Sequence, residues 1–188
     1  MNYEPKFGDI FLSDSNRLGA KIIKFLQEAP TLWHWIYRQI RGTQQICRYY
    51  HAGMVFDYEQ IIEQQGKVQV VPLKKILSRS IVIYRYKILN DFERRLIRTR
   101  ATEDIGKGFD IPLIIGKTLT WLTGIRWFAT IIGKLSKNEE ICISRVAKWY
   151  RGICTFGVKD YNLVTTKILD EYCLNNSSKW EVVYQNGG

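Results

Sequence analysis

The chain of 188 residues is long enough for one domain that buries its core without metal or disulfide cross-links. Hydrophobic residues make up 46% of it and aromatic residues 13%, which excludes an intrinsically disordered chain. The net charge of +10 attracts polyanions and anionic membrane surfaces, but the basic residues are scattered and form no known nucleic-acid-binding motif, so a solvated basic surface is the simplest interpretation.

The N-terminal residues 1–15 contain acidic side chains and lack a basic segment followed by a long apolar stretch. We therefore expect no signal peptide and a cytoplasmic location. The four cysteines, Cys47, Cys142, Cys154 and Cys173, are too sparse and too irregularly spaced for a disulfide framework or a zinc site. We expect reduced thiols, one of which is free to act as a nucleophile, and no metal or cofactor.

The first half of the chain predicts short strands and helices. Residues 7–15 alternate apolar and polar positions and end in a Ser/Asp turn, which predicts a strand. Apolar residues at helical spacing predict helices over 17–29 and 31–42, which end at Pro30 and Gly42. The next predicted elements are strands over 50–56 and 60–65, a strand around 67–73, a helical turn over 73–78 and a strand over 80–87.

A helix is predicted over 90–106, with Asn90 or Asp91 as its N-cap. The following segment, 111–135, is the most apolar part of the chain, but three basic residues interrupt it and no stretch long enough to span a membrane survives. It predicts a pair of core helices separated near Gly124, or alternatively a lid or an interfacial surface for an acyl chain.

The C-terminal part predicts two more helices. The first covers 138–152, with Asn138 as its cap and Cys142 in its first turn, and the second covers 161–174 as the last structured element. Residues 185–188 are expected to be a loose tail. Helices, then strands, then helices again indicate an α+β class and a single domain over residues 1–188.

A histidine and a glutamate occupy the two strands of the predicted hairpin. If the turn is centred on Asp57, His51 faces Glu63 directly, and Cβ atoms of opposite residues in an antiparallel pair lie about 4.5–5.5 Å apart. Glu63 can then accept a hydrogen bond from one ring nitrogen and leave the other to act as a base. A shift of one residue would place Glu63 on the wrong face of the sheet.

Cys142 is the candidate thiol, because the unsatisfied N–H groups and the dipole of a helix start favour the thiolate. Glu139 and Glu140 oppose this effect if their side chains point the same way. Taken singly, each residue also has a structural interpretation: His51 as a strand residue, Glu63 as a surface carboxylate and Cys142 as a small core residue. His34, between two tryptophans on a predicted helix, is expected to pack rather than to catalyse.

The order of short motifs along the chain resembles that of one known family. The motifs are "FGDIFL" (7–12), "HAGMVF" (51–56), "IIEQ" (61–64), "VQVVPL" (68–73), "GKGFD" (106–110) and "ICISRVAKWY" (141–150). This order resembles the circularly permuted NlpC-like group of papain-fold cysteine hydrolases. The resemblance implies a permuted papain-like fold in which an antiparallel sheet packs against helices, including the helix of the nucleophile.

The resemblance implies that Cys142 is the nucleophile, His51 the base and Glu63 the residue that orients His51. Gly8, Asp9 and Asp110 match positions that recur in the group for structural reasons. The chain departs from the group's pattern at Tyr50, Ile143 and Arg145, and segment 28–48 is expected to be an insertion. These departures bear on the substrate class and on the geometry of the oxyanion site.

Two functions follow from these observations. The first is a thiol-dependent hydrolase or acyltransferase that acts on a peptide, an amide or a lipid-linked acyl group, with peripheral contact to an anionic membrane. The second is a non-catalytic papain-like module that binds an anionic partner, either a membrane surface or a nucleic acid. The net charge of +10 and the altered residues beside Cys142 motivate the second function.

Overall fold

The computed structural model describes residues 3–14, 48–108, 142–161 and 164–186, together with Ile36, Leu119 and Thr123. Several predictions concern positions outside these residues: the helices over 17–29 and 31–42, almost all of the insertion 28–48, nearly the whole of segment 111–135, and the residues His34, Cys47, Asp110, Asn138, Glu139 and Glu140. In the described part of the chain, no helix combines the length and the hydrophobicity needed to cross a membrane.

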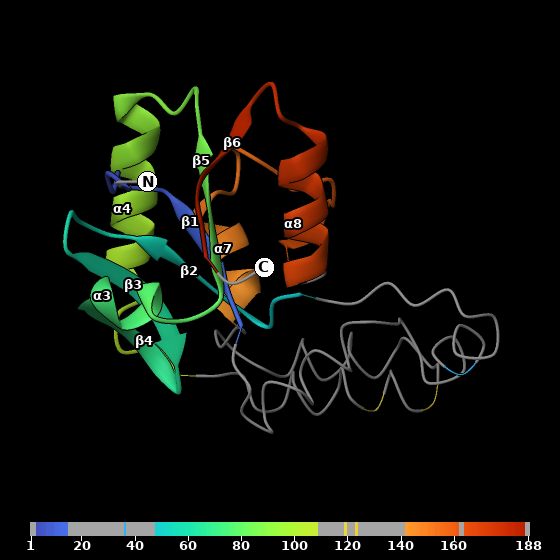
Figure 1. The fold of residues 1–188 in the computed structure, drawn as a ribbon, viewed down its shortest axis with the longest axis horizontal. Helices are drawn as coiled ribbons and strands as arrows, with labels where there is room; N and C mark the ends of the chain where they lie inside the picture. The colour runs from blue at the N-terminus through green and yellow to red at the C-terminus, as the bar shows by residue number, and fades with distance from the viewer. Residues whose placement is uncertain are drawn as a thin grey trace.

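A six-stranded antiparallel sheet lies at the centre of the described residues, with the strand order β4-β3-β2-β1-β5-β6 (Figure 1). The strands are β1 (Ile10–Ser13), β2 (His51–Val55), β3 (Gln60–Gln65), β4 (Lys67–Pro72), β5 (Ile81–Tyr86) and β6 (Trp180–Asn186). The first five confirm the predicted strands. Gly66 joins β3 to β4 at a φ of +81°, a conformation that glycine adopts without steric cost, so the hairpin turns tightly.

The last strand was not predicted, and the expectation of a loose tail over 185–188 is wrong at its start. Strand β6 pairs with β5 as far as Asn186, which lies opposite Ile81. Trp180 begins the strand and is buried beside Tyr86, with ring centroids 4.9 Å apart. Burial of so large an aromatic side chain, together with a free edge on β5, explains why the segment after the last helix becomes a strand.

Four helices are described: α3 (Lys74–Leu77), α4 (Asp91–Glu103), α7 (Cys142–Trp149) and α8 (Thr166–Asn175). Helix α4 confirms the predicted cap, because Asn90 accepts a hydrogen bond from Glu93 N–H while the Glu93 carboxylate accepts one from Asn90 N–H. Helix α8 begins five residues later than predicted, since the Thr165 side chain caps it by accepting from Ile168 N–H.

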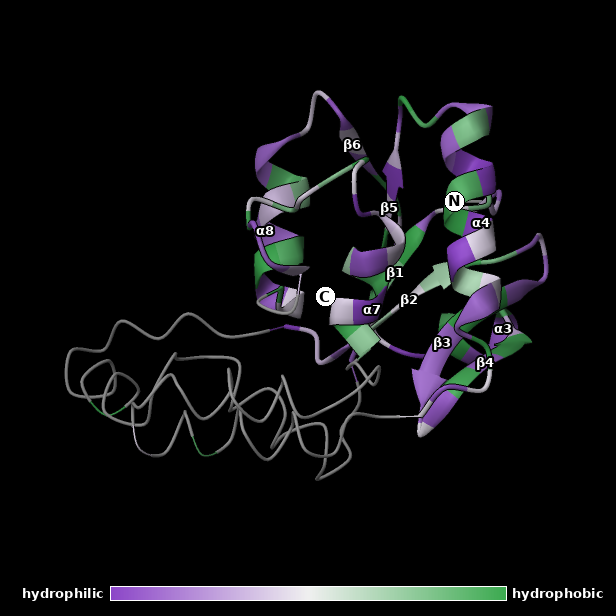
Figure 2. Ribbon diagram, turned by 180° about the vertical axis from the view of Figure 1, so that it is seen from behind, coloured by the Kyte–Doolittle hydropathy of each residue, from purple (hydrophilic) through white to green (hydrophobic). Residues whose placement is uncertain are grey.

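The helices divide between the two faces of the sheet. Helices α4, α7 and α8 share one core with Ile10, Leu12 and Met54, and α7 lies between the other two helices against the sheet (Figures 1 and 2). The short helix α3 packs on the opposite face, where Ile76 joins the side chains that alternate with those of the first core. The structure therefore has an α+β architecture in which the N-terminus of α7 lies near the start of β2.

Candidate functional site

The β2–β3 pair has a different register from the one predicted. Glu63 lies opposite Gly53, not His51, and the turn is centred on Tyr58, because Phe56 N–H donates to the Gln60 carbonyl. The predicted pairing is therefore wrong by two residues along β2. Side chains alternate with a period of two, so His51 and Glu63 still share one face of the sheet, as predicted.

The side chains of His51 and Glu63 contact each other diagonally across the β2–β3 pair. Nε2 of His51 lies 2.9 Å from Oε2 of Glu63, and both residues are buried. Gly53 stands between them in the pleat without a side chain, and the Phe11 ring occupies the space where a Cβ atom would lie. With Nε2 engaged by the carboxylate, Nδ1 is the ring nitrogen left for a second partner.

That second partner is Cys142, the first residue of α7. Its half-buried thiol is hydrogen-bonded to the His51 ring and to the backbone N–H groups of Ala52 and Ile143. Burial raises the pKa of the thiol, but the hydrogen bond and the charge of His51 outweigh it, and the backbone donors add to their effect. The pKa of Cys142 consequently lies below its usual range, which favours the thiolate.

The His51 ring shows the complementary shift. Burial lowers the pKa of His51, but the hydrogen bonds and negative charges of Cys142 and Glu63 raise it to about 9. The structure thus brings together the three predicted site residues, in the order thiol, imidazole, carboxylate. This arrangement can hold a thiolate–imidazolium pair near neutral pH.

Sequence reasoning missed the surroundings of Glu63. The Nζ atom of Lys75 lies 3.6 Å from Oε1, the nearest guanidinium nitrogen of Arg79 lies 4.0 Å from Oε2, and the Gln65 amide donates to Oε2 at 3.2 Å. Burial raises the pKa of the Glu63 carboxyl, but His51, Arg79 and Lys75 together bring it below its usual range. The two cations belong to the stretch "LKKILSR", which the sequence presented only as scattered surface charge.

Arg145, one of the departures from the family pattern, has a buried partner. The fully buried guanidinium of Arg145 lies 3.2 Å from Oδ2 of Asp104, and it also donates to the Gln64 side chain and the Gly108 carbonyl. Asp104 further accepts from Trp149 Nε1 at 2.9 Å and from Lys107 at 2.6 Å. This network ties α7 to the end of α4 and to β3, and so fixes the helix that carries Cys142.

The other residues matched by the resemblance have structural roles. Asp9 is fully buried and accepts hydrogen bonds from Tyr3 and from two nitrogens of Arg85, all at 2.8 Å. The Gly8 carbonyl accepts from the Tyr150 hydroxyl. Tyr50 packs beside His51 with ring centroids 5.9 Å apart, so this departure lies at the edge of the site.

Two further cysteines are described away from the site. Cys154 and Cys173 are buried in the core that α7 and α8 share, and burial raises the pKa of both thiols, which favours their protonated forms.

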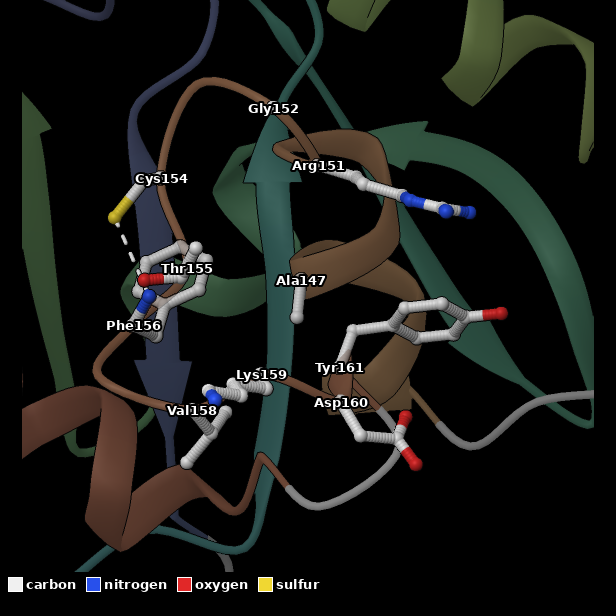
Figure 3. Close-up of a pocket in the computed structure, with 10 residues that line it drawn as sticks. All are labelled: Ala147, Arg151, Gly152, Cys154, Thr155, Phe156, Val158, Lys159, Asp160 and Tyr161. Atoms are coloured by element: carbon white, nitrogen blue, oxygen red, sulfur yellow. Dashed lines mark hydrogen bonds between the residues drawn. The ribbon is translucent and has the colours of Figure 1, made fainter.

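A pocket of about 260 Å³ adjoins the C-terminal end of α7, where Ala147 and Arg151 line it together with the loop over 152–161 (Figure 3). Cys154 points toward the backbone N–H of Phe156 there, at 3.5 Å. Neither Cys142, His51 nor Glu63 lines this pocket, so it is separate from the candidate site.

Comparison with known proteins shows little beyond the fold. No protein-family model matches the chain, and no curated protein matches it. The crystal structure of the metalloprotein yiiX from Escherichia coli O157:H7, DUF1105, is similar to this chain with a TM-score of 0.52 and 18% sequence identity, over 97% of this chain and 90% of that one. At this identity the likeness concerns the fold alone.

The description calls that protein a metalloprotein. Among the residues that the structure describes, no group of three or more His, Cys, Asp or Glu side chains is arranged to hold a metal ion. Cys142, His51 and Glu63 are instead linked by hydrogen bonds, from the thiol to the His51 ring and from the ring to the carboxylate.

Proposed function

We propose that the chain is a thiol-dependent hydrolase or acyltransferase with a circularly permuted papain-like fold. The observation that carries the proposal is the chain of contacts from the Cys142 thiol through the His51 ring to the Glu63 carboxylate. A nucleophile, a base and a group that orients the base are the three parts that covalent catalysis by cysteine requires. The low identity to the matched structure makes this site, and not the likeness, the basis of the proposal.

In the proposed reaction, His51 holds the proton of Cys142 and the thiolate attacks the carbonyl carbon of an amide or ester. The negative charge that develops on the carbonyl oxygen is stabilised by backbone N–H groups at the start of α7. When the C–N or C–O bond breaks, the imidazolium of His51 gives its proton to the leaving group, and the acyl group remains on sulfur as a thioester. Water or another acceptor, deprotonated by His51, then releases it.

Glu63 keeps the ring in the tautomer and orientation that this proton transfer needs. Because its Oε2 binds Nε2 of His51, Nδ1 is the ring nitrogen left to exchange a proton with the thiol. The substrate class proposed is a peptide or other amide, or a lipid-linked acyl group, since each offers the carbonyl carbon on which a thiolate acts.

Trapping of the acyl-enzyme tests the proposal. The protein is mixed briefly with p-nitrophenyl acetate near neutral pH and quenched in acid, and acetylated cysteines are located by peptide mass spectrometry. We expect acetylation of Cys142 at least tenfold faster than that of the other three cysteines, and loss of this preference in His51→Ala. Equal rates at all four cysteines, or no effect of His51→Ala, would contradict the proposal.

The second candidate function is non-catalytic binding of an anionic partner, which the net charge of +10 favours. Vesicles that contain anionic lipid and a short single-stranded nucleic acid serve as two separate probes. This function requires that retention of one of them persists at about 0.15 M salt, where attraction between exposed charges is screened. It also requires that Cys142 is acetylated no faster than the other cysteines.

A further inference from the structure

The Glu63 carboxylate is the most deeply buried charged group of the candidate site. Its side chain has a relative exposure of 0%, and Oε2 receives hydrogen bonds from His51 and Gln65. Oε1 accepts no hydrogen bond within the described part of the chain, and the nearest cation to it is Lys75 Nζ at 3.6 Å. One of the two carboxylate oxygens therefore depends on an ion pair alone.

The cations come from the face of the sheet that α7 does not cover. Lys75 is on α3 and Arg79 follows the end of α3, while Leu73 and Ile76 of the same segment are buried against β2 and β3. The Leu73 N–H donates to the Glu59 carbonyl at 2.7 Å, which fixes the start of the segment on the sheet. The packing of Leu73 and Ile76 on the sheet thus keeps the side chains of the same segment, Lys75 and Arg79, close to Glu63.

A carboxylate in this position needs opposite charge to stay ionised. Removal from water favours the protonated form, and a protonated Glu63 would no longer be an anionic acceptor for the imidazolium. His51 supplies one positive charge, but only while it is itself protonated. Lys75 and Arg79 place two further positive charges beside the carboxylate, and these can favour ionised Glu63 in either state of His51.

We propose that Lys75 and Arg79, here called the cation pair, are positioning residues that keep Glu63 an ionised acceptor for His51 throughout the proposed reaction cycle. The inference rests on the proposed function for its catalytic meaning. The groups that face Glu63 are His51 from β2, with Cys142 beyond it, and the cation pair from the α3 segment. The residue opposite Glu63 on β4 is the uncharged Gln69.

The titration of the Glu63 carboxyl carbon tests the inference directly. Protein labelled with 13C at glutamate carboxyl carbons is titrated by NMR, and the Glu63 signal is assigned by its loss in Glu63→Gln. We expect its midpoint to rise by about half a pH unit to one unit in Lys75→Met and in Arg79→Met, and further in the double variant. Lys74→Met is the matched control, because Lys74 neighbours Lys75 on α3 and should leave the midpoint unchanged.

The titration midpoint of the His51 ring distinguishes an electrostatic effect of the cation pair from a displacement of the Glu63 side chain. Removal of the cation pair takes repulsion away from the imidazolium, so an electrostatic role predicts that the His51 midpoint also rises. A merely structural role would let Glu63 move away from the ring, and the His51 midpoint would fall. Lys75→Arg retains the charge and should restore both midpoints to those of the wild type.

The acetylation assay, run on the same variants, distinguishes failure of this inference from failure of the proposed function. One outcome is that Cys142 is acetylated preferentially in the wild type while the Glu63 midpoint does not change in Lys75→Met and Arg79→Met. This outcome would overturn the proposed role of the cation pair and leave the hydrolase proposal intact. A raised midpoint without preferential acetylation would support the cation pair as the partner of Glu63 and overturn the hydrolase proposal. An equal rise in Lys74→Met would also overturn the cation pair, since it would indicate a general charge effect.

Discussion

Oε2 of Glu63 lies 2.9 Å from Nε2 of His51, although Glu63 pairs across the strands with Gly53. The contact is diagonal, and it passes over a residue that has no side chain. The ring of Phe11 fills the space at Gly53, and the carboxylate and the imidazole meet beside it. Gly53 is therefore part of the geometry of the site although it contributes no functional group.

Gly53→Ala should destabilise the protein. The added Cβ would lie 2.4 Å from Cζ of Phe11 and 2.7 Å from the Ile62 carbonyl oxygen, so both a ring and a backbone atom would have to shift. We expect a loss of about 1–3 kcal/mol in the free energy of unfolding, measured by urea denaturation. Gly106→Ala is the control for backbone strain alone, because φ is +88° there and nothing lies within 4 Å of the new methyl group. A Gly53→Ala variant as stable as the wild type would contradict the packing described here.

The pH dependence of Cys142 labelling should reveal its thiolate. Because the pKa of Cys142 is lowered, the rate of alkylation by iodoacetamide should reach half of its plateau at a pH clearly below the value of about 8.5 for an ordinary cysteine. In His51→Ala the midpoint should rise, since burial of the thiol is then opposed only by the backbone donors. An unchanged midpoint in His51→Ala would show that the ring does not set the state of the thiol.

The His51 ring should stay protonated to unusually high pH. Its pKa of about 9 lies above the ordinary histidine value of 6.5, so the proton is retained through neutral pH and lost as the pH rises through about 9. Ring signals in NMR spectra can follow this, because the chain has only two histidines and His34→Gln identifies the other. Glu63→Gln and Cys142→Ala should each lower the midpoint, because each removes a negative charge from the ring. A wild-type midpoint near 6.5 would contradict the geometry of the site.

The two partners of the buried ion pair should differ in the cost of their removal. Asp104→Ala removes a carboxylate that lies 3.2 Å from the fully buried guanidinium of Arg145, and we expect a loss of about 3–5 kcal/mol in the free energy of unfolding. Arg145→Met should cost less, because Asp104 keeps its contacts with Lys107 and Trp149. Urea denaturation of both variants and of the double variant measures the difference. Equal losses would contradict the expected difference between the two partners.

Local sequence patterns determined most of the elements that carry the site. Short apolar runs between turn residues predicted five of the strands, and the candidate caps Asn90 and Asp91 predicted the start of α4. The period of two put His51 and Glu63 on one face even though the predicted register was wrong, because an error of two residues preserves the face. These features depend on neighbours within a few positions, and such neighbours are visible in the sequence.

Only the tertiary structure decided what surrounds those elements. The register of β2 and β3 follows from the turn at Tyr58 and from the Phe11 ring over Gly53, and β6 forms because β5 offers an edge and Trp180 can be buried. The charges that face Glu63 come from the α3 segment, and the partner of Arg145 comes from the end of α4. Each of these contacts joins segments that lie apart in the chain, and burial decides which charged side chains must pair. A sequence read alone shows the charges but not which of them lose contact with water.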